Sequence, residues 1–466
     1  MSRAMRQATF GLAALFVLCS AASATTPQGE LVPAYERIEL DNGLIVLLLE
    51  HHELPLVDFE FRLRGGAVGD PVGKEGLADV TLSMMRKGTS KYSSEQLSEE
   101  LDFLGGTLRM GAGLEAGSIS AQFLTKDVSA GLALLQEILL HPTFPKDEVR
   151  KTLDRRVDGI REAKENPRQV LGNYYSGFLF GEHPFGRPVG GTETSLPNIK
   201  RKDIKQFYRA MVQPNRTLLA VVGDFDMAEM RQLIETTFGD WSRGTGVTPS
   251  LSIPANSSGT WVLLVDKPDA TQTYFRFGNV GVAKGNEDTA VLSLVNTVFG
   301  GRFTSWLMYE MRTKNGLTYS ARSRFVERSV PGAFYISSFT RTADTEKAID
   351  MALDILARLH EKGLTESELE SARNYIRGQF PPDFETSSDL ADAIIELEFF
   401  GLDRDYINGR TQRVDAVTVE DVRRAIAKHY PQENLSFVIV GQAKEIDKIA
   451  AKYGDVTRRK ISDVGF

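Results

Sequence analysis

Few residues of this sequence could carry out metal or acid–base chemistry. It contains one cysteine, Cys19, and six histidines: His51, His52, His141, His183, His360 and His429. No two histidines are four positions apart, so no helix can present two imidazoles on one face to a metal ion. His51 and His52 are neighbours after a strand-like run, where adjacent side chains point to opposite sides. This spacing predicts a surface turn at the histidine pair rather than a metal site.

A helix expected over residues 75–87 carries the next candidate group. Its apolar residues are spaced three to four positions apart, while Asp79, Ser83 and Arg86 lie together on another face. An acid beside a serine could belong to a hydrolase. However, a serine nucleophile of that kind needs a histidine base, and none stands at a motif position beside Ser83. The residues therefore disfavour a hydrolase built on Asp79 and Ser83.

This helix and its flanks resemble the zinc-site segment of the insulinase and pitrilysin-like metallopeptidases, on the frame Glu75-Gly76-Leu77-Ala78 and Met84-Met85-Arg86-Lys87-Gly88-Thr89. In that family the middle of the segment has the pattern H-x-x-E-H, with two zinc-binding histidines and a glutamate general base. A glutamate in a later helix is the third ligand. The matching positions here are Asp79, Leu82, Ser83 and Gly159. The resemblance thus implies that all four functional side chains are absent and that this half does not perform the family's zinc chemistry.

The most specific part of the resemblance lies in the second half, in the runs Phe299-Gly300-Gly301-Arg302-Phe303-Thr304-Ser305-Trp306-Leu307 and Met311-Arg312-Thr313-Lys314-Asn315-Gly316-Leu317-Thr318-Tyr319-Ser320. In active members of the family the arginine and tyrosine of this motif reach across to the zinc half. There they hold the substrate backbone and the developing oxyanion, which lowers the barrier without proton exchange. The resemblance implies this catalytic role for Arg312 and Tyr319. Without it, Arg312 is interpreted as a solvated helix-end cation and Tyr319 as a half-buried strand aromatic.

An internal repeat predicts the elements that position these residues. Residues 196–223 and residues 417–441 both pass from a helix start through an amphipathic helix to an apolar strand that ends in glycine, with an offset of 218 positions at the glycine. Between the two copies, residues 243–260 are rich in Gly, Ser, Thr and Pro and are predicted to be a linker. The predicted domains are therefore residues 37–242 and residues 261–460.

The grouping of the strand-like runs indicates the fold class. These runs do not alternate strictly with helices, which favours an α+β fold with mainly antiparallel sheets. The run from Leu44 to Leu49 is apolar at every position, which predicts a strand buried on both faces. We therefore expect two homologous domains, each a mainly antiparallel sheet packed with helices. The resemblance implies that they form a clamshell.

Composition excludes some functions. The chain has 466 residues, of which 42% are hydrophobic and 25% charged, the balance of a folded globular protein rather than a disordered one. Its formal net charge of −7 argues against a general nucleic-acid binder. After residue 24 no apolar run reaches the roughly 20 residues that a transmembrane helix needs, so no membrane span is expected.

The N-terminus has the features of a secretory signal peptide. Two arginines precede a short apolar run, and Ala22-Ser23-Ala24 provides the small-residue cleavage pattern. Residues 1–24 are therefore predicted to be a cleaved signal peptide, which implies a periplasmic protein. A lipoprotein anchor on Cys19 is disfavoured because Leu18 is a poor residue before such a cysteine.

Two functional hypotheses remain. In the first, the chain is the non-zinc-binding subunit of a periplasmic heterodimeric zinc metallopeptidase that degrades peptides or unfolded proteins. Arg312 and Tyr319 then complete the active site of a homologous, zinc-bearing partner; this chain holds no cofactor, and it is active only in the complex. In the second, it is a catalytically inactive peptide-binding or scaffold protein that adds peptides to a sheet edge. The fold alone does not decide between the two.

Overall fold

The computed structural model describes residues 30–246 and 250–466, and residues 31–466 form one compact unit. The predicted signal peptide and Cys19 lie outside the described residues. The first half contains β1 (Glu36–Glu39), β2 (Ile45–Glu50), β3 (Leu56–Arg64), α1 (Leu77–Met85), α2 (Ser94–Phe103), β4 (Thr107–Ala112), β5 (Ala116–Leu124), α3 (Val128–Leu140), α4 (Lys146–Lys164), α5 (Pro167–Phe180), α6 (Arg201–Met211), β6 (Thr217–Gly223) and α7 (Met227–Phe238).

The second half contains β7 (Trp261–Asp266), β8 (Gln272–Val280), α8 (Thr289–Asn296), α9 (Trp306–Met308), β9 (Ala321–Val326), β10 (Ala333–Arg341), α10 (Thr345–Lys362), α11 (Glu366–Gln379), α12 (Ser387–Phe400), α13 (Asp405–Asn408), α14 (Arg410–Ala416), α15 (Val419–His429), β11 (Ser436–Gly441), α16 (Ala443–Ala450) and β12 (Asp455–Lys460). It repeats the order of the first half from β2 onward, with the additional short helices α13 and α14 before α15 and the additional strand β12 at its end. Two π-helical turns, Thr297–Gly301 and Tyr309–Lys314, flank α9.

Each half is built on one six-stranded sheet, with the orders β1-β2-β6-β3-β5-β4 and β12-β7-β11-β8-β10-β9. Five strands occupy equivalent positions in the two orders, which is the structural form of the sequence repeat. In the first sheet only β2 and β6 pair in parallel, and in the second β7 pairs in parallel with both β11 and β12. The remaining pairs are antiparallel. The expected α+β class with mainly antiparallel sheets is confirmed.

The pattern of burial explains why these strands form. β2 is buried at four consecutive positions, Val46 to Leu49, as its uninterrupted apolar run predicts. β5 instead alternates between buried and half-buried residues, because one face packs on the core and the other is polar. Each half has its own main hydrophobic core between its sheet and its helices.

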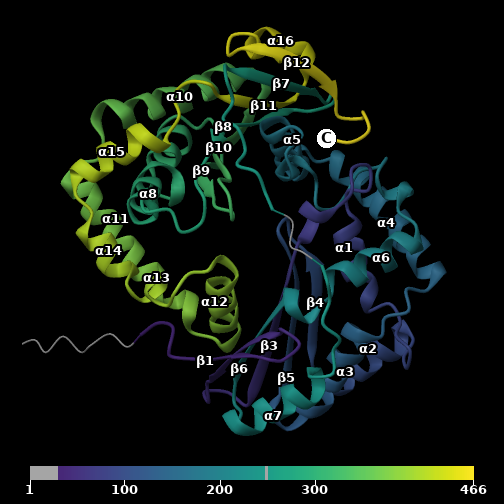
Figure 1. Cartoon of the computed structure of the whole chain (residues 1–466). Coiled ribbons are helices and arrows are strands. Elements are labelled where there is room, and N and C mark those ends of the chain that lie inside the picture. The colour runs from purple at the N-terminus through teal and green to yellow at the C-terminus, as the bar shows by residue number, and fades with distance from the viewer. Residues whose placement is uncertain (1–29, 247–249) are drawn as a thin grey trace, which may run out of the picture. The chain divides into compact units, whose positions relative to one another are not determined.

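Each half contributes one helix to the sheet of the other half. α12, from the second half, packs on β3 and β6 of the first sheet, where Leu390 and Ile394 join a cluster with Leu47 and Val222 (Figure 1). α5, from the first half, packs on β8 and β11 of the second sheet, where Tyr174 is fully buried. Because α5 and α12 hold matching places in the repeat, each sheet has its second face covered by the other half. This exchange joins the two halves through hydrophobic burial.

Carboxyl groups gather where α12 meets β3. Asp58 and Glu60 are buried on β3, and Asp392 of α12 pairs with Arg62 at 3.0 Å. Arg62 also contacts Glu60 at 3.1 Å. Burial raises the pKa of Asp58 to about 6, against the effect of a hydrogen bond from Gln122. Burial also raises the pKa of Glu60 to about 7. These two carboxyls are therefore protonated in the folded chain over a pH range in which they are ionised in the unfolded chain.

We expect the chain to lose stability as the pH rises through this range. Carboxyls of the unfolded chain titrate near pH ~4, so between about pH 4 and about pH 7 the folded chain holds protons that the unfolded chain has released. Since a tenfold change in proton affinity corresponds to about 1.4 kcal/mol, the two groups together lower the free energy of unfolding by a few kcal/mol. Urea denaturation at about pH 5 and about pH 8 measures this loss. Between these two pH values the double variant D58N/E60Q should lose clearly less free energy of unfolding than the native chain. The control D158N, changed at an exposed site, should lose as much as the native chain. A loss in D58N/E60Q equal to that of the native chain contradicts the prediction.

Candidate functional site

The helix expected over residues 75–87 is observed as α1, and a buried carboxylate holds its start. Asp70 accepts hydrogen bonds from the backbone N–H groups of Gly76 and Ala78, each at 2.8 Å. Gly76 precedes the helix with a positive φ of 96°, a conformation that favours glycine. This arrangement fixes the direction in which α1 presents Asp79 and Ser83.

An arginine from α4 occupies the space between Asp79 and Ser83. The Arg156 Nη1 atom lies 2.5 Å from Asp79 Oδ2, and Nη2 donates to Ser83 Oγ at 2.9 Å. Asp79 Oδ1 accepts from the backbone N–H of Ala112 on β4 at 3.0 Å, and Ser83 Oγ donates to the carbonyl of Val80 at 3.0 Å. The polar atoms of both side chains are therefore used within the protein. Sequence reasoning missed Arg156, although it lies one helical turn before Gly159.

The other two positions cannot hold or activate a metal-bound water. Leu82 is fully buried against Gly117, and Gly159 is exposed on α4 with open space around it. Within the described ranges no group of three or more His, Cys, Asp or Glu side chains is placed to hold a metal ion. The residues at these four positions do not fit zinc, and Arg156 puts a permanent positive charge where the cation would lie.

Restoring the ligands alone should give only weak zinc binding. The variant D79H/L82E/S83H/G159E supplies the missing side chains, but the guanidinium of Arg156 still repels a divalent cation at short range. Adding Arg156→Ala is expected to tighten zinc binding by at least about tenfold, which corresponds to about 1.4 kcal/mol. Isothermal titration calorimetry with zinc chloride measures the difference. Arg155→Ala, at the neighbouring exposed position, is the matched control and should leave zinc binding weak. Equal zinc affinity with and without Arg156 would contradict the proposed repulsion of zinc by this arginine.

The structure places Arg312 and Tyr319 in the lining of one pocket of about 350 Å³ in the second half. Arg312 belongs to the π-helical turn Tyr309–Lys314, and its guanidinium carbon lies 4.8 Å from the centre of the Phe303 ring. Tyr319 lies in the turn before β9 and is 76% exposed. The interpretation of Tyr319 as a half-buried strand aromatic is therefore wrong, because the strand begins two residues later. Within the described part of the chain, neither side chain has a hydrogen-bond or ion-pair partner.

The histidine pair lies in a turn after β2, as its spacing predicts. Its two rings have separate neighbours: His51 Nδ1 lies 2.9 Å from Ser387 Oγ, and His52 Nδ1 lies 2.8 Å from Asp224 Oδ1. The pair therefore does not act as one unit.

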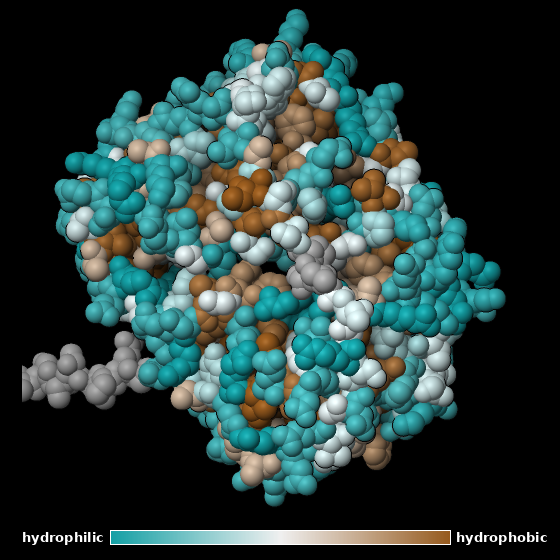
Figure 2. All heavy atoms as spheres, viewed as in Figure 1, coloured by the Kyte–Doolittle hydropathy of each residue, from teal (hydrophilic) through white to brown (hydrophobic). Residues whose placement is uncertain are grey.

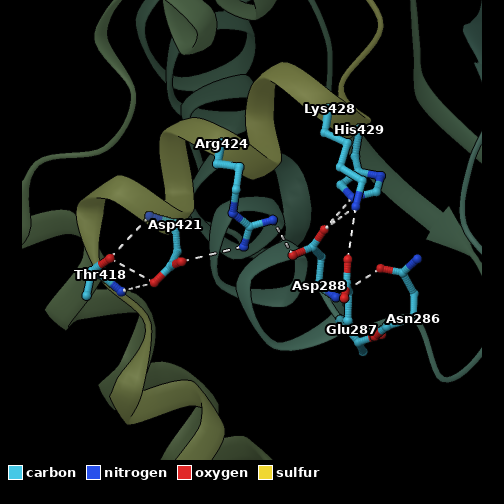
Figure 3. A network of polar contacts seen from close by, with 9 residues as sticks. Asn286, Glu287, Asp288, Thr418, Asp421, Arg424, Lys428 and His429 are labelled. Carbon is cyan, nitrogen blue, oxygen red and sulfur yellow. Dashed lines mark hydrogen bonds and ion pairs between the residues drawn. The ribbon is translucent and has the colours of Figure 1, made fainter.

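A different histidine takes part in an ionic network around the buried Asp288 in the second half (Figure 3). Asp288, only 3% exposed, precedes α8 and faces α15. Its carboxylate contacts Arg424 at 2.7 Å, Lys428 at 3.2 Å and His429 Nε2 at 2.7 Å. Sequence reasoning assigned no role to these residues, because the carboxylate and its partners are more than a hundred positions apart. The network connects two helices and is interpreted as structural.

The surface offers few large apolar groups. On the face shown in Figure 2, hydrophilic residues cover most of the outer surface and hydrophobic residues occur in separate groups. Phe303, Tyr309 and Tyr319 are among the large aromatic residues that are more than half exposed. All three are close to Arg312 in the sequence. None of the helices described in residues 30–246 and 250–466 has the length and hydrophobicity required to cross a bilayer.

Fold and site together define a peptidase-like protein with two α+β repeats, in which the residues at the expected zinc position of the first repeat, all within the described ranges, form no metal-ligand set. The chain belongs to the insulinase family of peptidases, family M16. Residues 47–193 match the family model described as insulinase (peptidase family M16), and residues 198–376 match the model described as peptidase M16 inactive domain. The resemblance inferred from the motifs is thereby confirmed.

Individual relatives agree with this assignment. The chain is 27% identical over 368 residues to an uncharacterized zinc protease of Mycobacterium leprae, covering 78% of this chain and 82% of the relative. It is 22% identical over 403 residues to a Helicobacter pylori protein described as a non-peptidase homolog, covering 86% and 92%. The crystal structure of a peptidase M16 inactive domain from Pseudomonas fluorescens superposes with a TM-score of 0.83 at 24% identity, covering 88% of this chain and 98% of that one. This last likeness shows the fold.

Proposed function

We propose that this chain is the non-zinc subunit of a two-chain periplasmic metallopeptidase that degrades peptides or unfolded proteins. The observation that carries the proposal is the contrast between the two halves. In the first half, Arg156 binds the side chains of Asp79 and Ser83. In the second half, Arg312 and Tyr319 line a pocket, and their donor groups have no partner among the described residues. A site with unpaired donors and no metal ligands is suited to complete the site of another chain.

In the proposed complex a homologous partner supplies the zinc and its bound water. The Arg312 guanidinium holds a backbone carbonyl of the peptide, and the Tyr319 phenol donates a hydrogen bond to the oxyanion as it forms. Neither group exchanges a proton in this step. A closed assembly of two chains also excludes water from the peptide. The predicted signal peptide supports the periplasmic location, where the partner would have to be found.

A second candidate is a peptide-binding or scaffold protein without a role in catalysis. Strands β4 and β9 each stand at one end of their sheet, so each has a backbone edge at which a peptide could add as a further strand. The Helicobacter pylori relative described as a non-peptidase homolog is in line with this candidate. It predicts no effect of Arg312 or Tyr319 on cleavage by any complex.

Affinity purification of the tagged chain from the periplasm of its own organism tests the proposal, with the companions identified by mass spectrometry. A near-stoichiometric companion that carries H-x-x-E-H supports the two-chain enzyme. Recovery of the chain alone, or with unrelated proteins, contradicts it and favours the scaffold. A tagged D288N variant serves as a control for destabilised bait, because it leaves Arg424, Lys428 and His429 without the carboxylate that they share.

A further inference from the structure

The pocket that contains Arg312 and Tyr319 has an unusual balance of charge for this acidic chain. Its lining also includes Gln272, Phe339 and Arg341. Both charged residues in the lining are arginines, and no carboxylate takes part in it, although the whole chain carries a net charge of −7. The Asp344 carboxylate pairs with Arg341 from outside the lining, so Arg312 supplies the uncompensated positive charge of the pocket and Arg341 offers the donors that Asp344 leaves unused.

The polar groups of the lining are mainly hydrogen-bond donors. The guanidinium of Arg312 contacts only the Phe303 ring, and the Tyr319 hydroxyl has no protein partner within the ranges described above. Gln272 Oε1 accepts a hydrogen bond from Tyr274 at 3.1 Å, which leaves its amide N–H groups free. The hydroxyl of Thr340, in contrast, already donates to the carbonyl of Leu317 at 2.7 Å. A ligand group with two acceptor oxygens can accept hydrogen bonds from these donors, whereas a ligand group that carries only donors cannot.

One wall of the pocket is apolar and rigid. The Phe339 ring stacks on Tyr274 with a centroid separation of 5.3 Å, so it is held in place beside the donors. Arg341 is bound on one side by Asp344 at 2.7 Å, which fixes the direction of its guanidinium. An apolar wall next to a fixed cation accommodates a short carbon chain that ends in a carboxylate.

We infer that this pocket binds a carboxylate group of a peptide, with Arg341 and Gln272 as residues that determine specificity beside Arg312 and Tyr319. This inference rests on the proposed function, since it names the chemical class of the peptide at the same site. The carboxylate belongs either to an aspartate or glutamate side chain or to the C-terminus of the peptide. In both cases the Arg341 guanidinium provides charge-assisted hydrogen bonds to the carboxylate, while Arg312 and Tyr319 hold the backbone carbonyl and the oxyanion of the same peptide.

Fluorescence anisotropy on the purified chain, with short fluorescein-labelled peptides of equal length, separates these sources. A C-terminally amidated peptide with one glutamate is compared with the same peptide carrying glutamine, and a neutral peptide with a free C-terminus is compared with its amide. The preferred carboxylate peptide is expected to bind about tenfold more tightly than its neutral counterpart. A preference in the first pair identifies the side chain, and a preference in the second pair identifies the C-terminus.

Arg341→Gln should remove most of this preference, and Arg341→Glu should reverse it in favour of a lysine-containing peptide. Arg341 is 74% exposed, so neither change threatens folding. Arg423→Gln, an exposed site elsewhere on the second half, makes the same change of net charge and should leave the preference intact. Equal binding of carboxylate and neutral peptides, or equal effects of R341Q and R423Q, overturns the inference. Because this assay needs no partner chain, its failure is distinct from a failure of the proposed two-chain enzyme.

Discussion

Replacing Tyr319 with phenylalanine is expected to lower the kcat of the assembled two-chain enzyme by about 10²–10³-fold, the usual cost of removing one donor to an oxyanion. The hydroxyl is the only part of the side chain that the variant loses, and because Tyr319 is 76% exposed no packing is disturbed. Arg312→Ala is expected to lower kcat/KM at least as much, because it removes both a charge and a group that holds the peptide. Steady-state cleavage of a quenched fluorescent peptide by the purified complex measures both effects.

Tyr309→Phe is the matched control for this experiment. Tyr309 lies in the same π-helical turn as Arg312 and is 54% exposed, but it does not line the pocket. Its variant should keep full turnover. Assembly of each variant with the partner is checked by size-exclusion chromatography. If Y319F and R312A assemble normally and cleave at the native rate, the proposed catalytic role is wrong and the scaffold hypothesis is favoured.

Replacing Asp288 with asparagine is expected to lower the free energy of unfolding by about 1.5–3 kcal/mol, because the largely buried His429 ring and the half-exposed Arg424 and Lys428 lose a charged hydrogen-bond partner. Asp288 is the shared partner of Arg424, Lys428 and His429, so all three donors lose a carboxylate at once. Urea denaturation at neutral pH measures the loss. Glu287→Gln is the control: this neighbouring side chain is 79% exposed and pairs only with Lys428, so its loss should cost less than about 1 kcal/mol. Equal losses for D288N and E287Q would rule out a structural role for the network.

The same network has a distinct pH signature. Burial by itself raises the pKa of Asp288, but hydrogen bonds from His429, Arg424 and Lys428 outweigh it and lower the pKa to about 2. The folded chain therefore releases this proton more readily than the unfolded chain does. The stabilisation is complete above about pH 4 and disappears as the pH falls toward 2. The difference in stability between the native chain and D288N should shrink over this acid range, opposite in direction to the loss expected from Asp58 and Glu60.

Local pattern was sufficient for several features. The apolar run of β2 predicted its burial, and the helix start signals and strand-ending glycines of the repeat predicted two equivalent halves. The motif around Arg312 and Tyr319 predicted a catalytic pair; the structure places both residues in the lining of one pocket, and their catalytic role stays a prediction. What these features have in common is that the residues concerned are close in sequence or repeat at a constant spacing.

Contacts between segments that are distant in the sequence could not be predicted from local sequence pattern. Arg156 is 77 positions from Asp79, and nothing in the spacing of α1 indicates that a guanidinium from α4 will bind that carboxylate. The exchange of α5 and α12 was equally hidden, since an apolar helix face does not specify which of two similar sheets it will cover. Motif and spacing predicted the family, the repeat and the replacement of the four zinc-site residues. The contact made by Arg156 and the way in which the halves are joined are seen only in the folded chain, because the free energy of those contacts depends on which surfaces meet after folding.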